Sequence, residues 1–257
     1  MSTPRTSASV VPTLDKLDGR VALITGGSGG IGRALVRRLA AERLAIAVGY
    51  GAQAEAAEKI AAEVVAEGGR AVAVGADLRR SDAPRALIAA VEAAFGPVDV
   101  LVSNAGLGRV QPLEEVCSED FDEMIAVNLR APFLLAQQTV PGMRERRFGR
   151  ILFISSVAAF TGGIVGPHYA ASKAGLHGLT HFLAVRLAPF GVTVNALAPA
   201  LIAETGMLPG DPGQLRGKIP VGRLGRPEEV ADLALAILRN PYLTNQVLAL
   251  DGGIHPR

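Results

Sequence analysis

The chain has 257 residues, of which 49% are hydrophobic, 19% are charged and 4% are aromatic. This length favours one large domain over two small ones, and the composition supplies a substantial core of aliphatic side chains. A net charge of +2 without a long basic block argues against nucleic-acid binding, and a single cysteine excludes an internal disulfide. The four histidines and the single cysteine lack the spacing of a metal site.

The N-terminal segment is polar and lacks the apolar core of a signal peptide. It predicts a flexible arm at residues 1–18, followed by a single domain at residues 19–257. No run in the sequence reaches the roughly 18 apolar residues that cross a membrane. We therefore expect a cytoplasmic protein without membrane association.

Short apolar runs alternate along the chain with longer amphipathic segments. The runs predict strands at residues 20–25, 44–49, 70–76, 98–103, 150–155, 192–198 and 246–250. The other segments predict helices at residues 30–42, 52–67, 82–95, 118–147, 168–188 and 227–238. Pro132 and Pro141 predict bends or local breaks in the fourth helix. This alternation predicts a three-layer, Rossmann-type α/β fold, in which a doubly wound parallel sheet of about seven strands has helices on both faces.

A glycine-rich turn, TGGSGGIG at residues 25–32, joins the first expected strand to the first expected helix. Glycines let the backbone approach a pyrophosphate closely, and a helix N-terminus offers free N–H groups to its charge. A glycine pattern between a strand and a helix is stronger evidence than the pattern alone. The turn therefore predicts a dinucleotide site.

Tyr169 and Lys173 form a Y-x-x-x-K pair on the helix expected at residues 168–188, where this spacing places both side chains on one face. Ser156 closes the fifth expected strand, and Asn128 lies in the preceding helical region. Reduction of a carbonyl requires a proton for the new alkoxide, and tyrosine is a usable acid with a pKa of about 10. A nearby ammonium favours the phenolate. His168, one position before the tyrosine, is expected at the edge of the pocket.

The glycine spacing T-G-x-x-x-G-x-G and the order of these motifs resemble the short-chain dehydrogenase/reductase family over nearly all of residues 19–253. Within that family the chain looks most similar to the β-ketoacyl-acyl-carrier-protein reductases. The resemblance implies an NAD(P)-dependent oxidoreductase that transfers a hydride between nicotinamide and a carbonyl or secondary alcohol. It implies Tyr169 as general acid and base, Lys173 as its charged partner, Ser156 as donor to the substrate oxygen, and Asn128 as holder of a water on the proton path.

The resemblance also implies a set of cofactor-binding residues. They are Gly26, Ser28, Gly30, Ile31, Tyr50, Asp77, Leu78, Asn104, Ala105, Gly106, Tyr169, Lys173, Pro199, Ile202 and Thr205. For two of them another role stays open, because Asp77 is also a candidate N-cap for the next helix and Asn104 is also able to tie strands together.

The end of the second expected strand, at Tyr50, carries no acid to bind the ribose 2′-hydroxyl of NAD. This favours NADP(H) over NAD(H). Arg33 is a candidate for the 2′-phosphate and equally a surface residue. Further along, Ala200 replaces the glycine common in the family, Thr205 stands one residue later than usual, and residues 203–220 predict a mobile lid over the substrate.

The substrate is not fixed by these motifs. Arg146 and Arg147 favour a 3-oxoacyl thioester on acyl carrier protein or coenzyme A, whereas Phe190 stands where such reductases often carry a basic residue. A small free ketone, quinone, steroid or sugar is the alternative, and a non-enzymatic dinucleotide-binding regulator is a weaker one. The resemblance further implies a homotetramer or dimer, with the helices at 120–147 and 168–188 as the natural interface.

Overall fold

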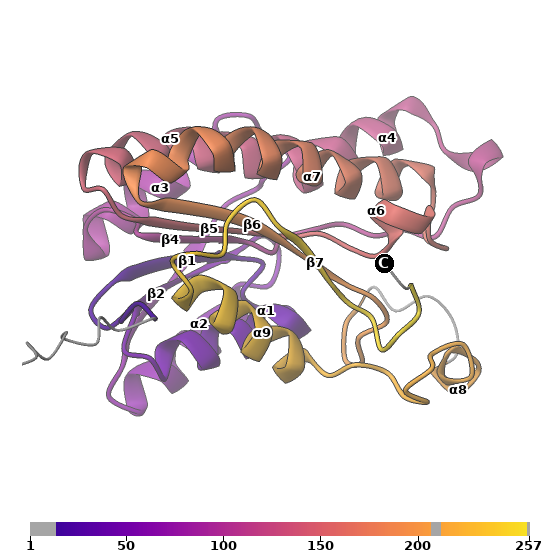
Figure 1. Cartoon of the computed structure of the whole chain (residues 1–257), viewed down its shortest axis with the longest axis horizontal. Helices are drawn as coiled ribbons and strands as arrows, with labels where there is room; N and C mark the ends of the chain where they lie inside the picture. Colours follow the sequence, from indigo (N-terminus) through magenta and orange to yellow (C-terminus); the bar gives the residue numbers. More distant parts are fainter. Residues whose placement is uncertain (1–13, 207–211, 256–257) are drawn as a thin grey trace, which may run out of the picture.

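The computed structural model describes residues 14–206 and 212–255. Its centre is a seven-stranded parallel sheet with the strand order β3-β2-β1-β4-β5-β6-β7 (Figure 1). The strands are β1 (Val21–Thr25), β2 (Ala45–Tyr50), β3 (Arg70–Gly75), β4 (Val100–Ser103), β5 (Gly149–Ile154), β6 (Val192–Pro199) and β7 (Val247–Leu250). The predicted doubly wound α/β fold is confirmed.

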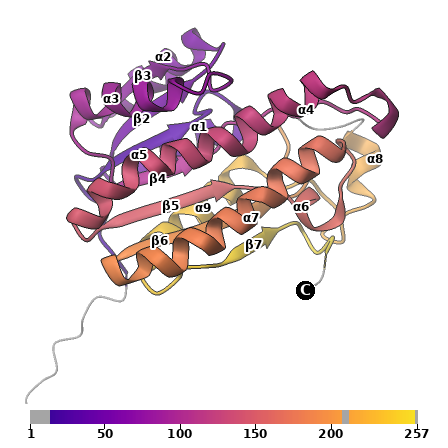
Figure 2. The ribbon, with the colours of Figure 1, turned by 90° about the horizontal axis from the view of Figure 1, so that it is seen from above.

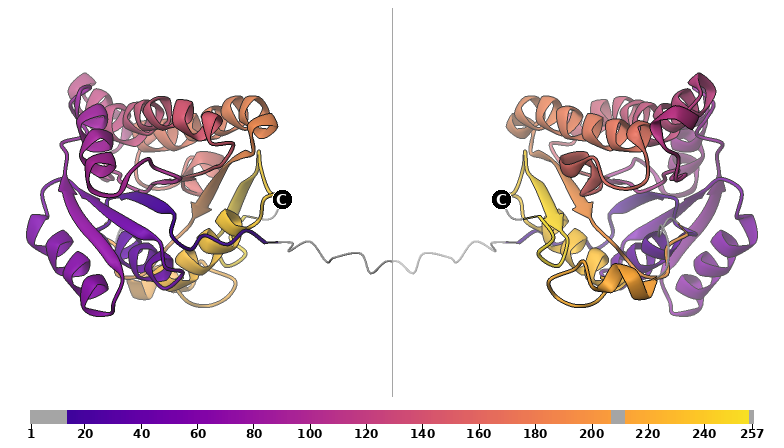
Figure 3. Two further views of the ribbon diagram at one scale, coloured as in Figure 1. Left: turned by 90° about the vertical axis from the view of Figure 1, so that its left-hand side faces the viewer. Right: turned by 90° about the vertical axis from the view of Figure 1, so that its right-hand side faces the viewer.

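Helices cover both faces of the sheet (Figures 1 and 2). One face carries α1 (Gly30–Ala40), α2 (Ala54–Ala66) and α9 (Pro227–Arg239). The other carries α3 (Ala83–Phe95), α5 (Ala131–Glu145) and α7 (Pro167–Leu187), which spread across that face when seen from above. The two end-on views show the same three layers from either side (Figure 3).

Successive residues of a central strand pack into two separate hydrophobic cores, one on each face of the sheet. In β1, Ala22 and Ile24 pack under α1 and α9, while Val21 and Leu23 pack beneath the opposite helices. Full burial of one such aliphatic side chain contributes roughly 1.5–3 kcal/mol. Because both faces of the strand are covered, its sequence is apolar throughout rather than alternating.

The expected helix at residues 118–147 is divided in the structure. A π turn, η2 (Ala126–Arg130), separates α4 (Ser118–Ile125) from α5. Pro132 directly follows Ala131, the first residue of α5 after the π turn, and Pro141 lies inside that helix. The predicted long helical region with a local break in it is therefore confirmed, and the break is the π turn that contains Asn128.

Short elements that the periodicity did not reveal occur in the loops. They are η1 (Leu113–Glu115), α6 (Ala158–Thr161), η3 (Ala188–Phe190) and α8 (Pro212–Arg216). The described part of the expected N-terminal arm, residues 14–18, lies against the domain. The Asp15 N–H donates to the carbonyl of Arg239 over 2.7 Å, and Leu17 is buried. The preceding part of that arm lies outside the described residues.

Candidate active site

The motifs meet at the carboxyl edge of the sheet, toward which all its parallel strands point (Figure 1). After β3 the chain returns past β1 and forms β4 on the other side of it. The loops after β1 and β4 therefore lead away from each other. Such a switch in strand order opens a crevice that binds ligands in α/β proteins. The glycine turn follows β1, residues 104–106 follow β4, and Ser156 follows β5.

The glycine turn is fastened to the end of β4. The Asn104 side-chain amide donates to the carbonyls of Thr25 and Gly26, each over 3.0 Å. The Thr25 hydroxyl oxygen accepts the N–H groups of Asn104 and Ala105, each over 3.1 Å. A Cβ on Gly26, whose φ is +64°, would lie 2.8 Å from Ala105 Cα. The strand-tying role considered for Asn104 is therefore present, and the backbone spacing at this turn depends on glycine.

The turn fits a dinucleotide diphosphate. A Cβ on Gly30 would lie 2.3 Å from the Glu204 carbonyl oxygen, so the backbone of the neighbouring loop approaches the turn closely. Helix α1 begins there without a side-chain N-cap in the described structure, which leaves its first N–H groups for a ligand. A hollow of about 570 Å³ adjoins the turn, with Ser28, Arg33 and Gln53 in its wall. An anionic cofactor therefore has both donors and a cation at this edge.

Asp77 and Leu78, which are expected to contact the adenine of the cofactor, differ in burial. Leu78 is buried, whereas the exposed Asp77 carboxylate accepts both the backbone N–H and the guanidinium of Arg79. The N-cap residue of α3 is Asp82, so the alternative role of Asp77 as that cap was wrong. The Arg79 hydrogen bonds hold the pKa of Asp77 below its usual value. Contact of Asp77 and Leu78 with adenine stays a prediction.

Tyr169 lies on the first turn of α7 and is buried against Met124 and Ala158. Burial raises the pKa of its phenol, because the interior disfavours the phenolate, and a hydrogen bond with the Ser156 side chain acts in the opposite direction. The Ser156 hydroxyl oxygen also accepts the N–H of Ala158 over 3.2 Å. Tyr169 is therefore a protonated phenol near neutral pH, with Ser156 beside it.

Lys173 is 3% exposed, and its ammonium nitrogen lies 5.8 Å from the centre of the Tyr169 ring. The ammonium donates to the Ile154 carbonyl over 2.9 Å. Burial lowers the pKa of Lys173 to about 8. A positive charge is thus held close to the phenol at neutral pH.

Asn128 fastens the loop after β4 to α7. Its side-chain oxygen accepts the Leu107 N–H over 2.8 Å, and its amide nitrogen donates to the Leu107 carbonyl and the Ser172 hydroxyl. A Cβ on Gly106 would lie 3.3 Å from both the Asn128 oxygen and Lys173 Nζ, so a side chain there would crowd both groups. The role of Asn128 as holder of a water stays a prediction.

The sequence predicted His168 at the edge of the pocket, and this prediction was wrong. His168 is fully buried, and neither ring nitrogen has a hydrogen-bond partner among the described residues. The Gln111 N–H donates to the Val165 carbonyl over 2.9 Å, which draws the loop after β4 over the start of α7. This contact between loops far apart in the sequence explains why helix periodicity misplaced the side chain.

The segment after β6 approaches the glycine turn. Ile202 is buried and pairs with Gly225, and the Thr205 hydroxyl donates to the Ile202 carbonyl over 2.9 Å. The Thr205 methyl carbon lies 3.5 Å from the position of a Cβ on Gly30. Of the expected lid at residues 203–220, positions 207–211 lie outside the described residues. Contacts of Pro199, Ile202 and Thr205 with a cofactor stay predictions.

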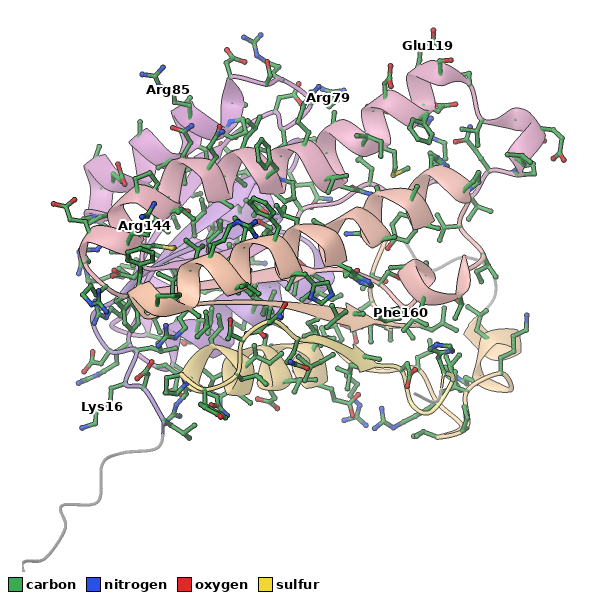
Figure 4. All side chains as sticks on the ribbon, turned by 45° about the horizontal axis from the view of Figure 1, so that its top comes forward. Lys16, Arg79, Arg85, Glu119, Arg144 and Phe160 are labelled. Carbon is green, nitrogen blue, oxygen red and sulfur yellow. The ribbon has the colours of Figure 1, made fainter. Side chains whose placement is uncertain are left out.

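The arginines before β5 lie at the amino end of the strands, away from Tyr169. Figure 4 shows Arg144 and Phe160 at opposite ends of the molecule. Arg146 binds the Val98 carbonyl, Arg147 binds the Pro189 carbonyl, and the Arg144 guanidinium lies 4.2 Å from the centre of the Phe190 ring. An acidic carrier protein bound to these arginines would therefore lie at the opposite edge of the sheet from Tyr169 of the same molecule.

The described residues contain no cluster of three or more histidines, cysteines and carboxylates able to hold a metal ion. They also show no helix that is long and apolar enough to cross a membrane.

Known proteins are similar to this chain in sequence and in fold. A 3-oxoacyl-[acyl-carrier-protein] reductase of Synechocystis is 39% identical over 243 residues, which cover 93% of this chain and 98% of the relative. A reductase of the same description from Aquifex aeolicus is 36% identical over 246 residues, with coverage of 93% and 98%. A blue fluorescent protein from a metagenomic library, solved in complex with NADPH, has a TM-score of 0.87 at 37% identity and covers 94% of this chain and 100% of its own.

A short-chain dehydrogenase/reductase from Serratia marcescens has the same TM-score, 0.87, at 36% identity, and the match covers 93% of this chain and 99% of that one. The family model described as short chain dehydrogenase matches residues 20–212. The match spans most of the chain, including the glycine turn and the tyrosine–lysine pair, so this protein belongs to the short-chain dehydrogenase/reductase family and is an oxidoreductase that uses a nicotinamide dinucleotide.

Proposed function

We propose that the protein reduces the 3-oxo group of an acyl thioester to a hydroxyl group, with NADPH as the reductant. The single observation that carries the reaction type is the buried Tyr169 phenol beside Ser156, with the Lys173 ammonium held near its ring. The thioester is supported by the two relatives described as 3-oxoacyl-[acyl-carrier-protein] reductases. The carrier of the acyl group is acyl carrier protein or coenzyme A.

Tyr169 is the proton donor in this proposal. Its raised pKa keeps the phenol protonated at neutral pH, so it has a proton to give to the alkoxide oxygen. Bound NADPH supplies the hydride. Ser156 donates its hydroxyl hydrogen to the carbonyl oxygen and stabilises the negative charge that develops there.

Lys173 makes the loss of that proton easier. Its ammonium stabilises the phenolate that remains on Tyr169, because opposite charges at short range favour the ionised form. The same ammonium would also bind a ribose hydroxyl of the cofactor, in the role that the family resemblance implies. Asn128 keeps the loop at Gly106 and Leu107 in place, and the water that it is expected to hold would return a proton toward Lys173.

The preference for NADPH is supported by two features of the hollow beside the glycine turn. No acidic residue ends β2, whose last residue is Tyr50, so nothing there selects the 2′-hydroxyl of NAD. Arg33 lines the hollow and supplies a cation for a 2′-phosphate. The NADPH complex of the metagenomic protein is consistent with this preference.

The alternative substrate is a small free ketone, quinone, steroid or sugar. It is kept because the arginines before β5 lie too far from Tyr169 of the same chain to support a carrier protein bound beside that tyrosine.

A homotetramer or dimer is proposed from the exposed apolar side chains of Phe133 on α5 and of Phe182 and Val185 on α7. A cytoplasmic location stays a prediction.

The test follows oxidation of NADPH and, separately, of NADH with acetoacetyl-coenzyme A, an acetoacetyl carrier protein, diketones, quinones and steroid ketones. We expect turnover of the acetoacetyl thioesters with NADPH. Turnover of a free ketone alone would favour the alternative substrate class. Nucleotide binding without turnover of any carbonyl would indicate the non-enzymatic regulator.

A further inference from the structure

Lys173 is tied at two points to the end of β5. Its ammonium donates to the Ile154 carbonyl over 2.9 Å, and its own backbone carbonyl accepts the Ser155 hydroxyl over 3.1 Å. Ile154 and Ser155 directly precede Ser156 in the chain. The strand end that carries Ser156 and the helix that carries Tyr169 are therefore joined at this place.

His177 completes the junction from the next turn of α7. Its Nε2 atom lies 2.8 Å from the Ser155 hydroxyl oxygen. A serine hydroxyl has one hydrogen, and here it is donated to the Lys173 carbonyl. Both bonds form together when His177 carries its hydrogen on Nε2 and donates it to the Ser155 oxygen. Ser155 is 4% exposed, so loss of that donor would leave a buried oxygen short of a partner.

The ring of His177 also contacts the residues that follow Ser156. Its centroid lies 4.6 Å from that of Phe160 on α6, the short helix that begins two residues after Ser156. Figure 4 shows Phe160 at the carboxyl edge of the sheet, beside the end of α7 that carries the catalytic residues. His177 thus reaches the chain on both sides of Ser156, at Ser155 by a hydrogen bond and at Phe160 by ring contact.

We propose that His177 is a positioning residue for the carbonyl reduction, acting through its hydrogen bond to Ser155. That bond holds Ser156 at the end of β5 in register with Tyr169 and Lys173 on α7. In this role His177 acts on the reaction through Ser155, the residue directly before Ser156. The inference rests on the catalytic roles proposed above for those three residues. Its physical basis is that proton transfer and hydrogen bonding to the substrate depend steeply on the separation of the reacting groups.

Two substitutions separate the hydrogen bond from the ring contact. His177→Gln keeps an N–H donor three bonds beyond Cβ, as in Nε2 of histidine, and removes the ring. His177→Phe keeps a ring against Phe160 and removes the donor. His181→Phe, one turn later on α7, is the matched control, because His181 is exposed and its ring nitrogen bonds Asn245 over 2.7 Å.

We expect His177→Phe to lower kcat about tenfold, with the KM for the acetoacetyl thioester and the Kd for NADPH changed by less than about twofold. His177→Gln is expected to keep most of the wild-type kcat, and His181→Phe all of it. Ser155→Ala is expected to lower kcat at least as much as His177→Phe, because it also removes the hydrogen bond to the Lys173 carbonyl. The double variant is expected to be no worse than Ser155→Ala alone, because that change already removes the contact with His177. Melting temperatures measured in parallel ensure that the assays are made on folded protein.

The proposal would be overturned if His177→Phe kept full kcat, or if His177→Gln lost more activity than His177→Phe. If His177→Phe does not fold, Ser155→Ala decides alone, and an unchanged kcat in that variant overturns the proposal. Failure of the proposed function gives a different result, since Tyr169→Phe would then keep its activity or the wild type would reduce no carbonyl.

Discussion

The ammonium nitrogen of Lys173 lies 2.9 Å from the carbonyl oxygen of Ile154, in a site where the lysine side chain is 3% exposed. Within the described residues, this buried cation has no carboxylate partner. A backbone carbonyl offsets only part of the desolvation cost, so the pKa of Lys173 falls to about 8. The same arrangement keeps the charge close to Tyr169, where the proposed chemistry uses it.

The pH dependence of the reduction is expected to follow from this pKa. Lys173 carries its charge below about pH 8 and loses it as the pH rises. We therefore expect kcat/KM for carbonyl reduction to fall as the pH rises through about 8, because the neutral amine no longer stabilises the phenolate. Initial rates measured across this range with saturating NADPH check the prediction. A profile that stays flat to pH 10 would contradict it.

Replacement of Lys173 by Met is expected to stabilise the fold while removing activity. A lysine whose pKa falls from 10.5 to about 8 destabilises the native state while it is charged, and one pKa unit is worth about 1.36 kcal/mol. We expect Lys173→Met to raise the free energy of unfolding at pH 7 by about 1–3 kcal/mol, since the lost bond to Ile154 offsets part of the gain.

This gain in the Lys173→Met variant is expected to depend on pH. It is largest below about pH 8 and shrinks as the pH rises from about 8 to 10.5, where the folded wild type is already neutral and the unfolded chain still binds a proton. Urea denaturation at pH 7 and at higher pH measures it. A variant less stable than the wild type at pH 7 would show that burial of the ammonium is fully compensated.

Tyr169→Phe is expected to remove the proton donor while keeping the packing of the ring and the binding of NADPH. The ring still packs against Met124 and Ala158, so the melting temperature should change little. We expect kcat to fall by at least about a hundredfold, the usual contribution of a general acid, with the Kd for NADPH nearly unchanged. NADPH binding followed by fluorescence, together with steady-state rates, tests both parts. Appreciable residual turnover would assign the proton transfer to another group.

Arg33→Ala is expected to weaken NADPH more than NADH. Arg33 lines the hollow beside the glycine turn, and a charged hydrogen bond to a 2′-phosphate is worth roughly 1.5–3 kcal/mol. We expect the KM for NADPH to rise about tenfold and the KM for NADH to stay within about twofold. Arg37→Ala is the matched control, because Arg37 on the next turn of α1 pairs with Glu63. Equal effects on both cofactors would place the 2′-phosphate elsewhere.

The sequence was sufficient for the fold and for the kinds of residue at the site. Apolar runs of strand length, separated by amphipathic helices, predicted the seven parallel strands. Periodicity did not locate the π turn around Asn128, where local hydrogen bonding changes without a change in polarity. It also misplaced His168, because a contact between Gln111 and Val165 covers the start of α7.

By itself, the sequence determined that a glycine turn, a serine and a tyrosine–lysine pair follow one another in an order typical of carbonyl chemistry. Only the tertiary structure decided that Ser155 joins Lys173 to His177 and that the arginines before β5 lie at the opposite end of the sheet from Tyr169. Such relationships depend on which strand ends and helix turns the sheet brings together. Residues far apart in the chain show no spacing from which that contact can be predicted.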